Sequence, residues 1–210
     1  MVSVLKGLHL VKKIQNNTVL NDVSLEVSKG EVFGIIGKSG AGKSSLLKAL
    51  SSLESISSGE ITLFGETLLL KDKKKLKAFR KKLGMIFQNF QLLSSRTVRE
   101  NIALPLELEK VKKPEIEKRV EELLALVGLT KRADSYPSSL SGGEKQRVAI
   151  ARALACNPSI LFCDEATSAL DPKTTNEILD LLCKLNEELS LTLLVVTHEM
   201  EVIQIGRAHV

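Results

Sequence analysis

The chain has 210 residues, of which 43% are hydrophobic and 26% charged, a balance that is typical of a globular protein and excludes a disordered one. Its formal net charge is +5, and a lysine-rich run between residues 71 and 82 supplies much of it. Such a run is compatible with a nucleic-acid or anionic membrane surface, but one tyrosine and no tryptophan leave little for base stacking. We therefore favour a solvated helix face and expect no nucleic-acid partner.

Membrane-spanning and secreted classes are disfavoured too. No stretch approaches the ~18 apolar residues that a transmembrane helix needs, and the N-terminus lacks the apolar core of a signal peptide. Cys156, Cys163 and Cys183 are scattered, and their spacing fits no metal site. We expect buried, reduced thiols, which favours a cytosolic compartment.

The N-terminal part of the chain alternates strands with turns. Val23, Leu25 and Val27 alternate with polar residues, which predicts a half-exposed antiparallel strand over 19–27 beside a first strand over 2–11. Further strands are predicted at 32–36, 61–65 and 83–87, and helices after residue 44 and over 71–82.

Helical periodicity replaces the strand pattern from residue 89 to about residue 156. Pro114 opens a segment whose apolar residues share one helix face, and Gly128 ends it. The predicted elements beyond it are a strand at 160–163, a helix through 178–185 and a strand at 192–196. Strands that alternate with helices predict an α/β fold with a parallel sheet, so we expect 89–156 to form an inserted helical lobe.

A glycine-rich octet lies between the strand at 32–36 and the next helix. It fits G-x-x-x-x-G-K-[ST] and comprises Gly37, Lys38, Ser39, Gly40, Ala41, Gly42, Lys43 and Ser44. In such a loop backbone N–H groups surround phosphate oxygens, the lysine meets the β- and γ-phosphates, and the hydroxyl ligates Mg²⁺. We predict that the octet, with Ser45, binds the phosphates of a nucleotide; the alternative is an ordinary glycine turn before a helix.

Two carboxylates follow the strand at 160–163. The carboxyl end of a parallel strand opens into the crevice where ligands of α/β proteins bind. Asp164 therefore suits a ligand of Mg²⁺, and Glu165 suits a general base that takes a proton from attacking water. The alternative is an acidic pair that caps the next helix.

A second glycine-containing helix start, Ser141, Gly142 and Gly143, taken alone predicts only an N-cap. The stretch LSGGEKQR around it, with the octet, Gln88, ILFCDE, SALD and His198, resembles the ATPase subunit of ABC transporters over essentially the whole chain. The resemblance implies a RecA-like P-loop ATPase core with an antiparallel β layer and an inserted helical lobe, with ATP and Mg²⁺ as ligands. It also implies a head-to-tail homodimer in which this helix start binds the γ-phosphate held by the partner.

The resemblance gives roles to further residues. Gln88 would sense the metal and the attacking water and signal to the helical lobe, while His198 would contact the γ-phosphate and orient Glu165. Asp171 would cross the dimer interface, although a turn residue before Pro172 accounts for it nearly as well.

Two features depart from the family pattern. The family commonly stacks an aromatic ring on adenine at the position of Ile14, so we expect ATP binding to survive with an adenine contact weaker by about 1–3 kcal/mol. The family also continues past His198 with more strands, whereas residues 205–210 match the translation of a sequencing-library adapter. We expect an ATPase domain over 1–204 that lacks its final strands, followed by an artefactual tail.

The stretches most similar to methionine importer ATPases are 85–90, 92–98, 103–108 and 163–172. This resemblance implies a peripheral protein on the cytoplasmic face of the cell membrane, with two transmembrane permease subunits as partners and a substrate-binding protein as an indirect one. A permease subunit is expected to dock near 92–98, just after Gln88. That family usually carries a C-terminal regulatory domain that binds methionine, which we expect truncation to have removed.

Three alternatives stay open. The first is the ATPase of another amino-acid or lipoprotein-related ABC system. The second is an ABC-type ATPase that acts on nucleic acid, although such proteins usually carry a long coiled-coil insertion or two ATPase units. The third is a fragment that binds ATP without turnover.

Overall fold

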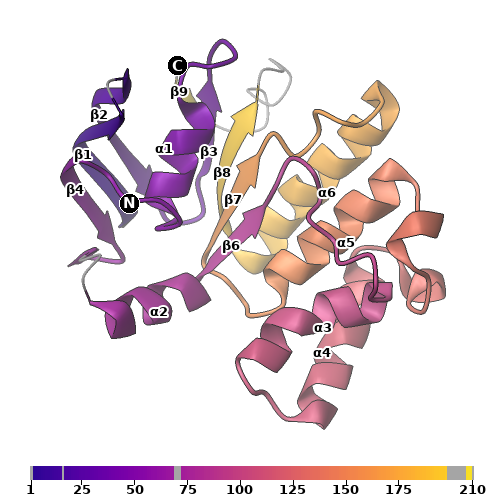
Figure 1. Cartoon of the computed structure of the whole chain (residues 1–210). Helices are drawn as coiled ribbons and strands as arrows, with labels where there is room; N and C mark the ends of the chain where they lie inside the picture. The colour runs from indigo at the N-terminus through magenta and orange to yellow at the C-terminus, as the bar shows by residue number, and fades with distance from the viewer. Residues whose placement is uncertain (1, 16, 69–71, 198–206, 210) are drawn as a thin grey trace.

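The computed structural model describes residues 2–15, 17–68, 72–197 and 207–209, and these form two sheets with helices between and beside them (Figure 1). The antiparallel sheet has the order β2-β1-β4-β5, with β1 Ser3–Ile14, β2 Asn17–Ser28, β4 Ser58–Leu63 and β5 Glu66–Thr67. The parallel sheet has the order β6-β7-β8-β3-β9, with β3 Val32–Ile36, β6 Leu83–Ile86, β7 Ile160–Asp164, β8 Thr192–Thr197 and β9 Arg207–His209. The predicted antiparallel layer and parallel sheet are both confirmed.

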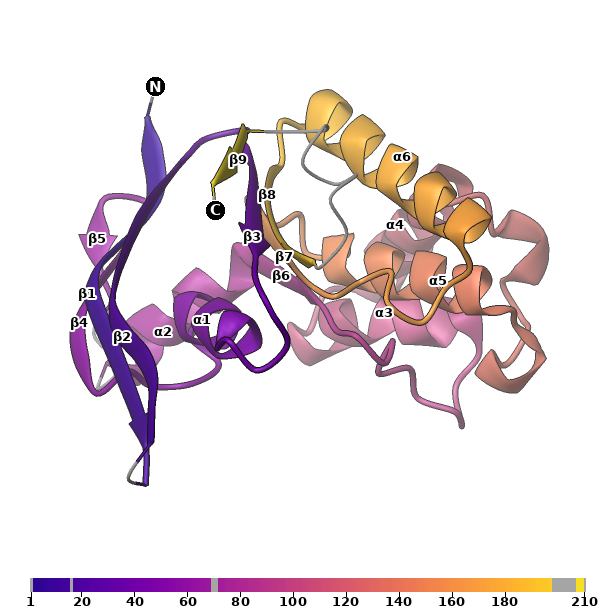
Figure 2. The ribbon, with the colours of Figure 1, turned by 90° about the horizontal axis from the view of Figure 1, so that it is seen from above.

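Helix α1 (Lys43–Leu50) lies between the two sheets, as the view from above shows (Figure 2). Leu47 and Leu50 are fully buried there, in a core that also contains Leu63 of β4 and Phe162 of β7. A fully buried leucine or phenylalanine stabilises the fold by about 1.5–3 kcal/mol. The antiparallel sheet is therefore held to the parallel sheet through the apolar side chains around α1.

The opposite face of the parallel sheet is covered by α5 (Gly142–Leu154) and α6 (Pro172–Leu189) (Figure 2). Phe162 of β7 belongs to the core around α1, whereas its neighbours Leu161 and Cys163 belong to the core formed with α5 and α6. All residues of β7 are buried. A strand covered on both faces is apolar throughout rather than alternating, which is why the sequence identifies this strand clearly.

The segment 89–156 is described throughout and contains helices but no strand. Its helices are α3 Val98–Leu108, α4 Lys113–Leu126 and α5, with short 3-10 turns before α5. Pro114 lies in the first turn of α4, where its missing N–H removes no helix hydrogen bond. Gly128 has a φ of 72° just beyond the end of α4, a conformation that glycine adopts without steric cost.

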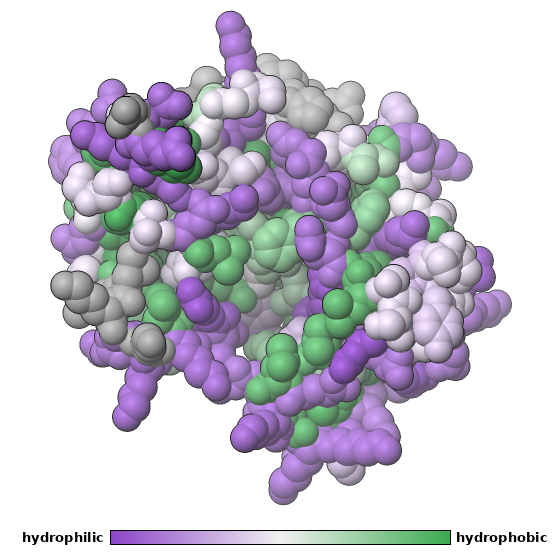
Figure 3. All heavy atoms as spheres, in the orientation of Figure 1, coloured by the Kyte–Doolittle hydropathy of each residue, from purple (hydrophilic) through white to green (hydrophobic). Residues whose placement is uncertain are grey.

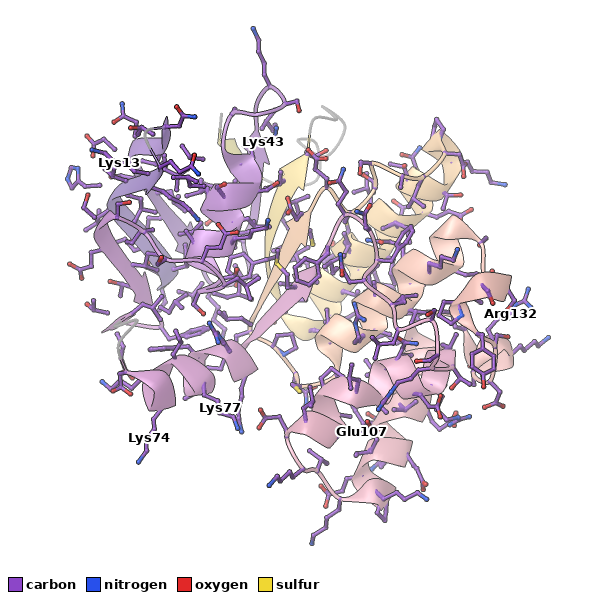
Figure 4. The ribbon with its side chains drawn as sticks, viewed as in Figure 1. Lys13, Lys43, Lys74, Lys77, Glu107 and Arg132 are labelled. Atoms are coloured by element: carbon purple, nitrogen blue, oxygen red, sulfur yellow. The ribbon has the colours of Figure 1, made fainter. Side chains whose placement is uncertain are left out.

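The lysine-rich run forms α2 (Lys73–Lys81), which confirms the predicted helix. Asp72 caps it by accepting hydrogen bonds from two backbone N–H groups, and Phe79 is buried in the core between the sheets. Lys74 and Lys77 project from α2 at the lower edge of the molecule in Figure 4. Among the described residues, no helix has the length and apolar character that crossing a bilayer requires.

Residues Arg207–His209 form β9, which pairs in parallel with β3. From the sequence we expect an artefactual tail over 205–210 and missing final strands. This pairing adds a strand to the edge of the parallel sheet. The DNA that encodes residues 205–210, and not the strand pairing, decides whether the tail is native. The domain boundary at residue 204 therefore stays a prediction.

Candidate functional site

The glycine-rich octet, the predicted phosphate loop, joins β3 to α1 at the upper end of the parallel sheet in Figure 4. Lys43 is the first residue of α1 and is only 8% exposed. Its ammonium donates hydrogen bonds to the carbonyl oxygens of Gly37 and Lys38, at 2.7 and 3.0 Å. The loop thus curls around its own lysine, and this cation lies at a helix N-terminus, where the helix dipole also favours an anion.

The loop conformation requires glycine at two positions. Gly40 and Gly42 have φ values of 80° and 90°, in the left-handed region that disfavours residues with a Cβ. A Cβ on Gly42 would also lie 2.6 Å from the carbonyl oxygen of Val19, so this glycine lets β2 approach the loop. Among the described residues no side chain caps α1, and the first N–H groups of a helix without such a cap can donate to an anion.

A hydroxyl and a carboxylate meet beside this loop. Ser44 Oγ donates to Asp164 Oδ1 at 2.7 Å, and Asp164, the last residue of β7, is 7% exposed. Among the described residues no three His, Cys, Asp or Glu side chains gather into a metal centre, so phosphate oxygens and water would have to complete the coordination. That donor set fits Mg²⁺, which proteins usually hold through one or two side-chain oxygens together with substrate phosphates.

Glu165 and Gln88 lie at the same edge of the sheet, because β6 and β7 are adjacent parallel strands and both residues follow their carboxyl ends. Gln88 Nε2 donates to Glu165 Oε2 at 2.9 Å. Glu165 has a φ of 48°, and a left-handed conformation costs a non-glycine residue about 1–3 kcal/mol. Its N–H donates to the carbonyl oxygen of Val196 at 3.1 Å, which helps to hold the conformation.

The second glycine-containing helix start is the first turn of α5. Ser141 caps this helix: its Oγ accepts the Glu144 N–H, and the Glu144 carboxylate accepts the Ser141 N–H. A Cβ on Gly142 would lie 3.1 Å from a side-chain carbon of Leu170. Helices α5 and α1 cover opposite faces of the parallel sheet (Figure 2). Within one chain, the start of α5 therefore does not reach the phosphate loop.

Asp171, which directly precedes Pro172, caps α6. Its carboxylate accepts hydrogen bonds from the backbone N–H and the Oγ1 of Thr174, at 3.1 and 2.6 Å, and these bonds lower the pKa of the Asp171 carboxyl. Thr174 also lies against α5, because a Cβ on Gly143 would approach its Cγ2 to 2.5 Å. Gly143 therefore has a packing role between α5 and α6 besides the role that the resemblance implies.

The remaining predicted site residues are Ile14, Ser45 and His198. Ile14, the expected adenine contact, is the last residue of β1 and is 49% exposed, opposite Asn17 in a hairpin. Ser45 lies in the first turn of α1 and is half-buried. His198 lies outside the described residues; the preceding residue, Thr197, pairs with Ile36 of β3.

Two residues that the sequence analysis missed support the chain after Gln88. Asn101 is fully buried; its Nδ2 donates to three carbonyl oxygens of the segment 93–97, and its Oδ1 accepts one N–H from that segment. Arg152 of α5 donates to the carbonyl oxygens of residues 90 and 91. A polar side chain among the apolar residues of a helix is the sequence signal that marks both positions, because such a group must find partners when it is buried.

The model of the ABC transporter family matches residues 20–168. The methionine import ATP-binding protein MetN 3 of Shouchella clausii is 56% identical over 202 residues, which cover 95% of this chain and 59% of that protein. The methionine import ATP-binding protein MetN of Photorhabdus laumondii is 53% identical over 205 residues, which cover 96% of this chain and 60% of that protein. The chain thus spans about three-fifths of the length of these curated relatives.

Solved structures are similar over nearly the whole chain. The ATP-binding cassette MJ0796, in a dimeric post-hydrolysis state bound to ADP and Pi, has a TM-score of 0.86 and 38% identity, covering 96% of this chain and 91% of that one. The cbiO1 protein of Clostridium perfringens, part of the ABC transporter complex cbiONQ, has a TM-score of 0.89 and 30% identity, covering 98% and 83%. The chain therefore belongs to the ABC transporter family and has the fold of its ATP-binding cassettes.

Proposed function

We propose that the chain binds MgATP and hydrolyses it as the energy-coupling subunit of an ABC importer. The observation that carries the proposal is a pair of hydrogen bonds beside the lysine-bearing loop, from Ser44 to Asp164 and from Gln88 to Glu165. Together with Lys43, the residues in these bonds place a cation, oxygen ligands for a metal and a carboxylate with an amide partner at one edge of the parallel sheet. Phosphoryl transfer to water depends on positioning and charge stabilisation by groups of these kinds.

Each group has a task in this proposal. The N–H groups of the loop and the Lys43 ammonium bind the β- and γ-phosphates and offset their charge. Ser44, Asp164 and Gln88 would hold Mg²⁺, which neutralises charge on the phosphate oxygens. Glu165 takes the proton of the attacking water, and the Gln88 amide, which donates to the same carboxylate, orients that water.

We infer that a second copy of the chain completes the site. Ser141, Gly142 and Gly143 form the N-cap and first residues of α5, on the far side of the parallel sheet from α1 (Figure 2). The Ser141 hydroxyl and the N–H groups of the two glycines therefore reach a γ-phosphate only in another chain. A head-to-tail pair would place two helix N-termini against one polyanion, which is electrostatically favourable. The dimeric state of the similar cassette MJ0796 supports this arrangement.

A groove beside the helical lobe offers a place for the membrane subunit. It has a volume of about 510 Å³ and is lined by apolar residues such as Met85, Leu104 and Leu108 together with charged residues such as Lys77 and Glu109. Figure 3 shows apolar residues gathered around this hollow, with hydrophilic residues along its edges. An apolar floor with a charged rim suits an amphipathic helix, and we propose that a permease subunit docks one here.

The transported substrate is the remaining element of the proposal. Methionine is favoured because proteins named for methionine import are 53% and 56% identical over most of this chain. In that role the protein acts at the cytoplasmic face of the membrane, and a substrate-binding protein acts on it indirectly through the permease. Uptake of labelled methionine by cells that express the chain with its neighbouring permease genes tests this assignment, and uptake of another amino acid alone would overturn it.

The nucleotide site is tested by two substitutions. Lys43→Ala removes the loop cation, so ATP affinity should fall by at least about tenfold, which is ~1.4 kcal/mol, in a titration with a fluorescent ATP analogue. Lys48→Ala is the matched control, because Lys48 lies on the same helix but pairs with Glu54 at 3.7 Å. Normal ATP affinity in Lys43→Ala would contradict the proposal.

The second substitution, Glu165→Gln, should keep ATP affinity and abolish hydrolysis. Normal hydrolysis in Glu165→Gln would contradict the proposal.

A further inference from the structure

The chain just after Gln88 contains two consecutive residues in an unfavourable conformation. Phe90 and Gln91 have φ values of 56° and 53°, in the left-handed region. In that region the Cβ of an L-residue lies too close to the backbone carbonyl oxygen, and two such residues in succession need support from outside the turn. The carbonyl oxygens of both residues receive that support from one side chain.

That side chain is Arg152, in the last turn of α5. Its Nη1 donates to the Gln91 carbonyl oxygen at 2.6 Å and its Nη2 to the Phe90 carbonyl oxygen at 2.8 Å. Burial lowers the pKa of the Arg152 guanidinium, and none of the ion pairs found among the described residues includes it. A half-buried cation that bonds two backbone carbonyls fixes their spacing, because the guanidinium presents its donors as a rigid planar fork.

Arg152 also connects three parts of the site. Gln88, two residues before the turn, donates to Glu165. The first residue of α5 follows Ser141, and a helix of this length is a rigid rod of about 20 Å. Arg152 and Gln91 line the groove of about 510 Å³ beside Phe87. The Arg152 guanidinium therefore contacts the turn, lies on the helix that begins after Ser141 and lines the groove.

We propose that Arg152 is a positioning residue that holds the 90–91 turn and thereby sets the Gln88 amide against Glu165. The inference rests on the proposed hydrolysis in that it assigns Arg152 a part in the step that Gln88 and Glu165 perform. The structural part of the proposal does not depend on hydrolysis, because it states only that the Arg152 guanidinium fixes the conformation of the 88–92 segment.

The first experiment measures that conformation directly. Hydrogen–deuterium exchange of the 210-residue chain should show faster exchange over 88–92 in Arg152→Gln than in the unaltered chain, with α5 still protected. Arg152→Lys keeps the charge and can reach one carbonyl, so its exchange should lie between the two. Arg119→Gln is the matched control, since Arg119 donates to the Leu154 carbonyl oxygen at 3.1 Å, and it should leave 88–92 unchanged. Unchanged exchange in Arg152→Gln would overturn the proposal.

The second experiment is a double-substitution cycle on the rate of ATP hydrolysis. Arg152→Gln should reduce kcat by about tenfold to a hundredfold, the scale of a misplacement of about 1 Å, while the KM for ATP changes less than about threefold. In a Gln88→Ala background, Arg152→Gln should have little further effect, because the residue through which it acts is gone. Independent, multiplying effects would overturn the proposal. If the unaltered chain does not hydrolyse ATP, the proposed function fails, and the exchange experiment still decides the role of Arg152.

Discussion

At the scale of single residues, two buried amides have opposite environments. Asn101 and Gln146 are both 0% exposed. The Asn101 amide makes four hydrogen bonds to the backbone of residues 93–97, whereas neither Nε2 nor Oε1 of Gln146 has a partner among the described residues. A buried polar group without a partner costs about 1–3 kcal/mol. The same chemical group therefore stabilises the fold at one position and destabilises it at the other.

Paired substitutions test this difference. Asn101→Leu removes one partner from four backbone groups and should lower the free energy of unfolding by about 3–5 kcal/mol. Gln146→Met replaces an unpaired amide by an apolar side chain of similar shape and should leave the free energy unchanged or raise it by about 1 kcal/mol. Urea unfolding followed by circular dichroism measures both. Equal losses in the two variants would show that Gln146 has a partner in solution.

At the scale of elements, an ion pair ties the antiparallel sheet to the segment after α1. Lys12 of β1 is 6% exposed and hydrogen-bonds to the Glu54 carboxylate, which Lys48 of α1 approaches to 3.7 Å. The hydrogen bond from Lys12 lowers the pKa of the Glu54 carboxyl below its ordinary value. Removing one member of such a pair is costly, because it leaves a buried charge without its partner.

The pH dependence of stability tests this pair. Because the pKa of Glu54 is lowered in the folded state, its contribution is fully present above the ordinary glutamate pKa of about 4.3 and is lost as the pH falls towards the folded-state value. Glu54→Gln should therefore lower stability at pH 7 and flatten the decline below about pH 4.3. Thermal unfolding between pH 7 and pH 3 measures this.

A surface pair provides the control for that experiment. Lys6 and Glu26 lie 3.7 Å apart with both side chains exposed, and exposed pairs contribute little. Glu26→Gln should therefore change stability at pH 7 less than Glu54→Gln does. An acid decline that stays equally steep in Glu54→Gln would contradict the role of the Lys12–Glu54 pair.

At the scale of the whole molecule, the phosphate loop and the Ser141 helix start lie on elements that cover opposite faces of one sheet (Figure 2). In the proposed function both features bind one nucleotide, and they can do so only between two chains because they do not meet within one chain. We therefore expect assembly of the dimer to depend on ATP rather than on apolar contacts alone.

Size-exclusion chromatography with light scattering tests this assembly. Glu165→Gln should be mainly monomeric without nucleotide and dimeric with MgATP, because ATP binds but is not hydrolysed. Adding Ser141→Arg, which places a long side chain at the start of α5, should prevent the dimer. It should leave the monomer's ATP affinity within about twofold, since Ser141 is not part of that chain's own loop and an affinity change below ~0.4 kcal/mol is small. A Glu165→Gln chain that stays monomeric with MgATP would contradict the head-to-tail site.

The sequence by itself determined the local features of this protein. The glycine-rich octet is contiguous, and its glycines and lysine match the pattern that binding of phosphate through the backbone requires. The strands β3, β6, β7 and β8 are mostly apolar, and α4 carries its own start and stop signals at Pro114 and Gly128. Each of these depends on interactions between residues close in the chain or on burial of one short segment.

Only the tertiary structure decided which distant residues meet. That Gln88 bonds Glu165, that Ser44 bonds Asp164, and that Arg152 holds the turn at 90–91 all depend on strand order and on the packing of α5. The close approach of Gly143 on α5 to Thr174 on α6 has the same origin. Contacts between residues far apart in sequence leave no periodic pattern in the chain, because they are set by how whole elements pack and not by local backbone preferences.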